Sequence, residues 1–225
     1  MIANEDVQEG AKIVTLAADL LLGTSVNDRK GREASNLRRA CGELKANGKN
    51  FIVDNVIAEK LSNAFERARL NGATMSEFNR IREIILAEAV VSLVAVLLKN
   101  SCICFSLQQM SLVIVSMTFT SREDVDEVRK EVNAAFDPAE DNAADEMALE
   151  VYRTLIALHA AVTFHMYETA RPLPQMLNYK FGTPRPTLIL SYRLYDTAAR
   201  ADQLREENKI VHPAFAPREG QALAF

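Results

Sequence analysis

Apolar residues recur every three or four positions along most of the first 171 residues. This spacing places them on one side of a helix, so it predicts a body built of α-helices. The dipeptide Asn47-Gly48 is a turn signal and should separate two of these helices. Thr74, followed three residues later by Glu77, has the spacing of a capping box and opens another helix. The first helices are expected over residues 5–22, 29–46, 51–70 and 74–98.

The most apolar part of the chain runs from Ile84 to Phe119 and is divided by Lys99-Asn100. Each half is shorter than the roughly twenty apolar residues that a membrane span needs, or is interrupted by polar residues. We therefore expect two buried helices, with a membrane hairpin as the alternative. Residues 111–119 are rich in Val, Ile, Thr and Phe, so a strand is an alternative there. Apolarity on all sides predicts burial inside a bundle or at a subunit interface.

Thr120-Ser121 precedes an acidic turn, which is typical of the start of a helix. We expect this helix to end by Pro138, because proline cannot donate the backbone hydrogen bond that a helix interior requires. A long helix should then run from about Ala143 to Ala170. The proline-rich segment after it marks a domain boundary, with a helical body over residues 1–171 and a small module over residues 172–225.

The spacing of apolar and polar residues changes in residues 172–225. Residues 173–181 alternate as in a strand, and a helix should begin near Pro186, which suits the first turn. Asp196-Thr197 should break this helix and begin a second one, which ends near Asn208. A terminal strand is expected at residues 222–225. The predicted fold class is therefore mainly α, a multi-helix body followed by a small C-terminal βααβ (LysM-like) module.

The composition and the absence of known motifs argue against several classes of function. The net charge of −4 argues against a general electrostatic grip on nucleic acid, so no specific nucleic-acid binding is expected. Three cysteines cannot pair completely, and we expect free thiols. His159 and His165 lie six residues apart on different helix faces, which does not match the His-Glu-X-X-His zinc motif. Without a Gly-rich phosphate loop or a Gly-X-Ser-X-Gly motif, we predict no enzyme, no cofactor and no metal site.

Residues 192–217 carry an unusual combination of motifs. Tyr192-Arg193 with Tyr195, Arg200-Ala201-Asp202, Asn208, and His212-Pro213 with Phe215 and Pro217 resemble the C-terminal part of the DNA circularisation (tail N) proteins of Mu-like contractile-tailed bacteriophages. The resemblance extends more weakly upstream to about Phe119, and the family's N-terminal circularisation domain is not visible in this chain.

The resemblance implies a structural component of a contractile phage tail, in the baseplate hub or at the junction of hub and tube. Such a protein is made in the host cytoplasm and resides in the virion. Its expected partners are tail tube and baseplate hub or wedge proteins. A homo-oligomeric ring is expected, and no membrane span. Two alternatives stay open, a peptidoglycan-binding tail accessory protein and a membrane-associated helical protein.

Arginine and tyrosine are enriched at the centres of protein interfaces, which makes the motif residues candidates for docking. Within this set, we expect Tyr192 and Phe215 to be buried as part of the module's own core. The predicted interface consists of Tyr192, Arg193, Tyr195, Arg200, His212 and Phe215.

Overall fold

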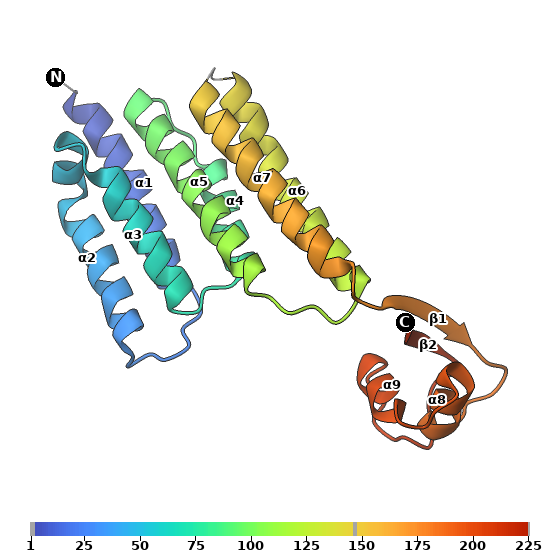
Figure 1. The fold of residues 1–225 in the computed structure, drawn as a ribbon. Helices are drawn as coiled ribbons and strands as arrows, with labels where there is room; N and C mark the ends of the chain where they lie inside the picture. The colour runs from blue at the N-terminus through green and yellow to red at the C-terminus, as the bar shows by residue number, and fades with distance from the viewer. Residues whose placement is uncertain (1–2, 146–147, 225) are drawn as a thin grey trace. The chain divides into compact units, whose positions relative to one another are not determined.

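The computed structural model describes residues 3–145 and 148–224, and it is mainly helical (Figure 1). Within these ranges it has nine helices and one two-stranded antiparallel sheet, so the predicted mainly α class is confirmed. The chain divides into two compact units, Met1–Met117 with Glu131–Thr163, and Thr118–Lys130 with Phe164–Phe225. Two helices contribute to both units, α6 (Arg122–Asp145) and α7 (Leu149–Ala170). The domain boundary near residue 171 stays a prediction.

The first unit begins with five helices that pack side by side (Figure 1). Helix α1 contacts α2 and α5, and α5 also contacts α3 and α4. Aromatic rings fill the interior: Phe65 stacks on Phe78 at 6.5 Å between centroids and meets Phe105 at 6.0 Å. Their burial supplies much of the driving force for packing. The five helices are α1 (Asn4–Leu22), α2 (Arg32–Val53), α3 (Ile57–Leu70), α4 (Met75–Ala87) and α5 (Leu93–Val115).

The predicted turn at Asn47-Gly48 is wrong, because α2 continues through it to Val53. Gly48 is buried in α2, and a Cβ atom there would lie 3.4 Å from the Val14 side chain of α1, at the lower edge of ordinary van der Waals contact. The chain turns instead at Asn55, whose φ of 55° is a left-handed conformation that asparagine tolerates. Gly48 therefore lies inside a helix rather than in a turn, and the dipeptide alone does not distinguish these two positions.

The predicted helix from Thr74 to Leu98 is also wrong. Its start is confirmed, because Thr74 and Glu77 form the capping box. However, α4 ends at Ala87, and α5 begins only at Leu93. The carboxylate of Glu9 accepts hydrogen bonds from the backbone N–H groups of Val91 (2.9 Å) and Ser92 (2.7 Å). A carboxylate at a helix N-terminus is favourable, so a residue far away in sequence fixes this break.

Helix α5 runs without interruption past Lys99-Asn100, so the predicted division there and the alternative strand at residues 111–119 are both wrong. The hydroxyl groups of Ser106 and Ser111 donate to carbonyl oxygens four residues earlier and are satisfied inside the helix. By length and composition, α5 could cross a membrane. It is the one such helix in the described part of the chain, and 44% of its apolar window is buried inside the protein.

Helix α6 passes through Pro138 and continues to Asp145, so the end predicted at this proline is wrong. Proline removes one helical hydrogen bond, and residues on both sides of Pro138 contact His159 of α7. Phe136 is fully buried and stacks on the His159 ring of α7 at 4.7 Å between centroids. Helices α6 and α7 thus form an antiparallel hairpin.

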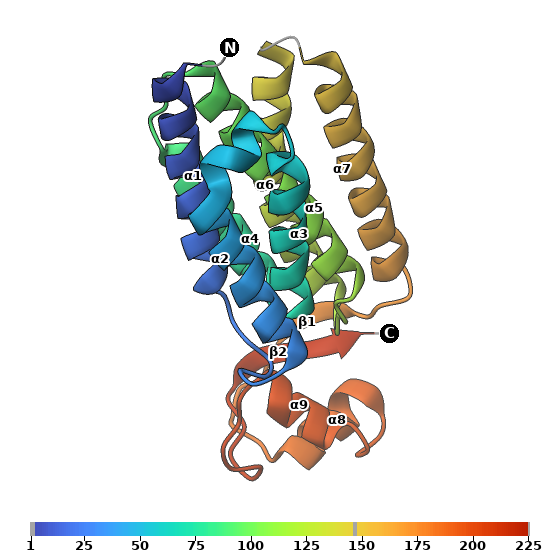
Figure 2. The same cartoon turned by 90° about the vertical axis from the view of Figure 1, so that its left-hand side faces the viewer.

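The second unit contains β1 (Gln175–Lys180), α8 (Thr187–Tyr195), α9 (Ala201–Glu207) and β2 (Glu219–Ala224), in this order. The strands are antiparallel, with Gln175 opposite Ala224 and Lys180 opposite Glu219. Both helices lie on one side of the strand pair (Figure 2). Asp196, with φ 55°, breaks the helices as predicted, but α9 begins at Ala201 rather than at Asp196-Thr197.

A small apolar core holds the second unit together, because two strands alone bury too little surface to be stable. Strand β1 contributes Tyr179 and β2 contributes Ala222, and Phe181, Leu194 and Tyr195 pack against the edge of this core. The start of α6 is joined to the same unit, because the Glu123 carboxylate accepts a hydrogen bond from the Met176 N–H at 2.7 Å. The core residues are Tyr179, Leu190, Leu204, Ile210, Ala216 and Ala222.

Candidate functional site

Tyr192 and Phe215 are exposed, so the prediction that they belong to the core is wrong. Tyr192 is 63% exposed and Phe215 is 74% exposed. Helix α8 turns Leu190 and Ser191 inward, and this leaves Leu188 and Tyr192, one turn apart, on its outer side. The sequence pattern did not separate the two faces, because α8 is apolar on both.

The loop that carries Phe215 is fixed beside the first turn of α8. The Thr187 N–H donates to the Pro213 carbonyl oxygen at 2.7 Å, and the Ala216 N–H donates to the Arg185 carbonyl oxygen at 3.1 Å. Val211 in this loop is almost fully exposed. We call four of the exposed apolar side chains of α8 and this loop the C-terminal apolar surface: Leu188, Tyr192, Val211 and Phe215.

The structure brings four of the six predicted interface residues together in two pairs. The Arg200 guanidinium lies over the Tyr195 ring, 4.8 Å from its centroid. The His212 ring lies 5.3 Å from the Phe215 ring, and His212 Nδ1 accepts a hydrogen bond from the Ala214 N–H at 3.2 Å. This second contact matches a loop-positioning role for His212. Arg193 is exposed on α8.

Tyr179 is buried in the core of the second unit, and Tyr195 is partly buried against the edge of this core. Burial raises the pKa of Tyr195 above its ordinary value, and the nearby positive charge of Arg200 opposes part of this effect. Burial also raises the pKa of Tyr179, with a smaller contribution from the neighbouring Tyr195. Both phenols therefore stay neutral at physiological pH, which is the form that a packed core tolerates.

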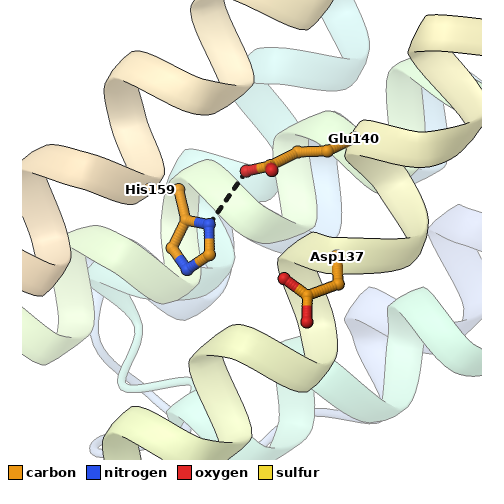
Figure 3. Close-up of side chains that lie close together, drawn as sticks. All are labelled: Asp137, Glu140 and His159. Atoms are coloured by element: carbon orange, nitrogen blue, oxygen red, sulfur yellow. Dashed lines mark hydrogen bonds and ion pairs between the residues drawn. The ribbon is translucent and has the colours of Figure 1, made fainter.

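A second cluster lies on the α6–α7 hairpin, where Asp137, Glu140 and His159 come close together (Figure 3). One ligand atom from each residue lies within 4.8 Å of the other two. His159 Nδ1 is 2.9 Å from the Glu140 carboxylate, and Nε2 is 3.0 Å from the Asn133 side-chain oxygen. Two carboxylates and an imidazole are suitable ligands for a divalent transition metal.

The same contacts give this cluster a structural role, because both ring nitrogens of His159 already face oxygen atoms of α6. A metal ion would have to replace at least one of these interactions. Sequence reasoning missed the cluster because it ended the helix at Pro138. With α6 continuous, Asp137 and Glu140 are three residues apart and share a face, so their spacing was the available signal.

An apolar groove lies within the first unit, between α5 and the α6–α7 hairpin. Its volume is about 630 Å³. Helix α5 contributes Ile103, Cys104 and Phe105 to the wall, and Leu155 lies opposite on α7. Arg82 of α4 also lines it, although its side chain is only 6% exposed. None of the six interface residues predicted from sequence lies in this groove.

Comparison of the chain with models of known protein families and with curated proteins gives no match.

Proposed function

We propose that this protein is a structural component of a contractile phage tail, located in the baseplate hub or at the junction of hub and tube, and that it acts through protein–protein assembly. The motif between Tyr192 and Pro217, which resembles the Mu-like tail N family, supports this proposal. In this account the chain is not an enzyme and resides in the virion. Its partners are tail tube and baseplate hub or wedge proteins, and copies of the chain form a ring.

The proposal includes a LysM-like module at the C-terminus. Two observations support it, the order β1–α8–α9–β2 and the antiparallel pairing of strands that are separated by both helices. The module would act as a docking unit rather than as a glycan reader, because layout alone does not imply the ligand of other modules with this order.

The observation that carries the proposal is the exposure of two aromatic side chains of the motif, Tyr192 and Phe215. Large exposed aromatic side chains are typical of the centre of a protein interface, where they bury area at small entropic cost. Arg193 lies next to Tyr192 and would supply directional hydrogen bonds at the rim. The C-terminal apolar surface would therefore bind the neighbouring tail protein.

Helix α5 fits this account as a helix that packs into the bundle along one side. Ten of its residues are buried, among them the polar Ser106, Gln109 and Ser111. Gln109 also accepts a hydrogen bond from Arg69 of α3 at 2.8 Å. A transmembrane helix would expose its polar side chains to lipid at high cost, whereas here they are satisfied inside the bundle.

The test is the double variant Tyr192→Ala/Phe215→Ala, expressed from the gene's own locus in the strain that carries it. Tyr167→Ala is the matched control, because Tyr167 is also 63% exposed but lies on α7, outside the surface. We expect a folded double variant that reduces the yield of complete tails at least tenfold, and normal yield with the control. A normal tail yield from the double variant would refute the proposed docking surface.

A further inference from the structure

We propose that the groove between α5 and the α6–α7 hairpin binds an anionic amphiphile with a single apolar chain, such as a fatty carboxylate or a single-chain lipid phosphate. The proposal is independent of the tail function. The first support is the volume of the groove, because about 630 Å³ falls within the range of about 300–1,000 Å³ that is common for small-molecule sites.

The groove is lined mainly by apolar side chains, which favours a ligand with an apolar chain. Side chains from α5 and α7 form most of the wall, and the α6 side adds the small residues Ala139 and Ala143. Leu86 and Leu97 lie at the rim and remain substantially exposed to solvent. An apolar chain in the groove would remove this surface from water, which is favourable in proportion to the area buried.

The positive charge of Arg82 in the groove favours a ligand with an anionic headgroup. Among the described residues of the lining, Arg82 is the one cation, and the carboxylate of Glu150 points to solvent and pairs with Arg153 at 3.6 Å. Arg82 Nε donates to Asn79 at 3.0 Å, and Nη2 lies 3.6 Å from Glu83, whose side chain is 60% exposed. An exposed carboxylate at this distance offsets little of the cost of burying a guanidinium.

The contacts described for Arg82 involve Nε and Nη2, and in this proposal Nη1 donates to the headgroup of the ligand. Guanidinium groups bind carboxylates and phosphates in two-point geometry. Burial also lowers the pKa of Arg82, in keeping with a site that is poor in compensating charge. A ligand with its headgroup at Arg82 and its chain along Ile103 and Leu155 would match both the charge and the apolar lining of the groove.

Cys104 gives a local readout, because its thiol lines the groove and is partly exposed, whereas Cys41 and Cys102 are fully buried. The experiment measures dodecanoate binding to the full chain by calorimetry, below the micelle concentration, and Cys104 alkylation by N-ethylmaleimide with and without dodecanoate. We expect one molecule bound per chain, weaker binding of dodecanol, and at least tenfold slower alkylation when dodecanoate is present.

Two variants locate the headgroup and the chain. Arg82→Met should weaken dodecanoate binding at least tenfold, whereas Arg80→Met, which removes an exposed charge two residues away on α4, should not change it. Thr154→Trp, on an exposed position of the α7 wall, should block the groove without removing Arg82. This second variant keeps the test decisive if Arg82→Met fails to fold.

Vesicles of phosphatidylglycerol are added to distinguish binding of a monomeric amphiphile in the groove from adsorption to a lipid surface. Binding of monomeric dodecanoate or lysophosphatidate with protection of Cys104 supports the groove, whichever of the two binds more tightly. Adsorption to vesicles without protection of Cys104 would overturn the proposal, because the protein would then bind lipid elsewhere. Equal affinity for dodecanol and dodecanoate would also overturn it, as would unchanged binding in both groove variants.

Discussion

The side-chain amide of Asn208 forms two hydrogen bonds with the backbone of Gln221. Its oxygen accepts from the Gln221 N–H at 2.7 Å, and its nitrogen donates to the Gln221 carbonyl oxygen at 2.8 Å. The same nitrogen donates to the Leu204 carbonyl oxygen at 2.9 Å. One side chain therefore pairs with an edge of β2 as a neighbouring strand would, and it also caps the end of α9.

Replacing Asn208 by alanine should destabilise the second unit by roughly 2–3 kcal/mol, because three hydrogen bonds are lost at about 1 kcal/mol each. The amide hydrogen of Gln221 should exchange with solvent much faster, and hydrogen exchange by mass spectrometry or NMR measures this. Asn178→Ala, at an exposed position of β1, is the control. Unchanged exchange at Gln221 would show that the Asn208 contact does not hold β2.

Gly220 cannot carry a side chain without disturbing this contact. A Cβ atom there would lie 2.2 Å from Asn208 Oδ1 and 2.6 Å from the Tyr179 hydroxyl oxygen. Gly220→Ala should therefore destabilise the second unit by about 1–3 kcal/mol through overpacking. Gly182→Ala is the matched control, because its added methyl group meets nothing within 4 Å. Thermal unfolding of both variants checks this, and equal melting temperatures would contradict it.

Glu77 should make the first unit sensitive to acid. Burial raises the pKa of this carboxyl, but hydrogen bonds from Thr74 and Ser25 outweigh burial and hold the pKa below its ordinary value. Because the folded pKa is the lower one, the stabilisation is present above the unfolded pKa of about 4.3 and is lost as the pH falls through the folded value.

The stability difference between wild type and Glu77→Gln should therefore shrink as the pH falls below about 4. Urea unfolding at several pH values measures this difference. Glu59→Gln, in the first turn of α3 and exposed, is the control. A constant difference for Glu77→Gln between pH 7 and pH 3 would contradict the prediction.

His159 should be a main support of the α6–α7 hairpin. His159→Ala removes the hydrogen bonds to Glu140 and Asn133 and the stacking on Phe136, and we expect a loss of roughly 2–4 kcal/mol. His165→Ala, on another face of the same helix, should cost less. Unfolding followed by circular dichroism compares the two variants. A larger loss in His165→Ala would refute this role of His159.

The local signals in the sequence predicted the structure well where the deciding contact is itself local. The capping box of Thr74 and Glu77, the break at Asp196 and the order of elements after residue 172 follow from neighbouring residues alone. The predictions failed where a distant residue decides. Glu9 sets the break between α4 and α5, and packing on α7 carries α6 through Pro138.

The distinction between local and distant contacts also applies to the candidate sites. The residue types made Tyr192 and Phe215 candidates for docking but did not predict their exposure, because α8 is apolar on both sides and its buried face depends on the sheet. The groove beside Arg82 combines residues from helices that are remote in sequence, and the cluster around His159 depends on the contact between α6 and α7. No spacing rule within one helix brings such residues together.

The most direct test of the tail proposal is cross-linking mass spectrometry on contractile tails purified from the strain that carries the gene. Lys209 in the loop after α9 and Lys180 on β1, which pairs with Glu219, are both exposed and available for coupling. The account predicts cross-links from these two lysines to tail tube or baseplate hub proteins. Absence of the protein from complete tails would contradict it.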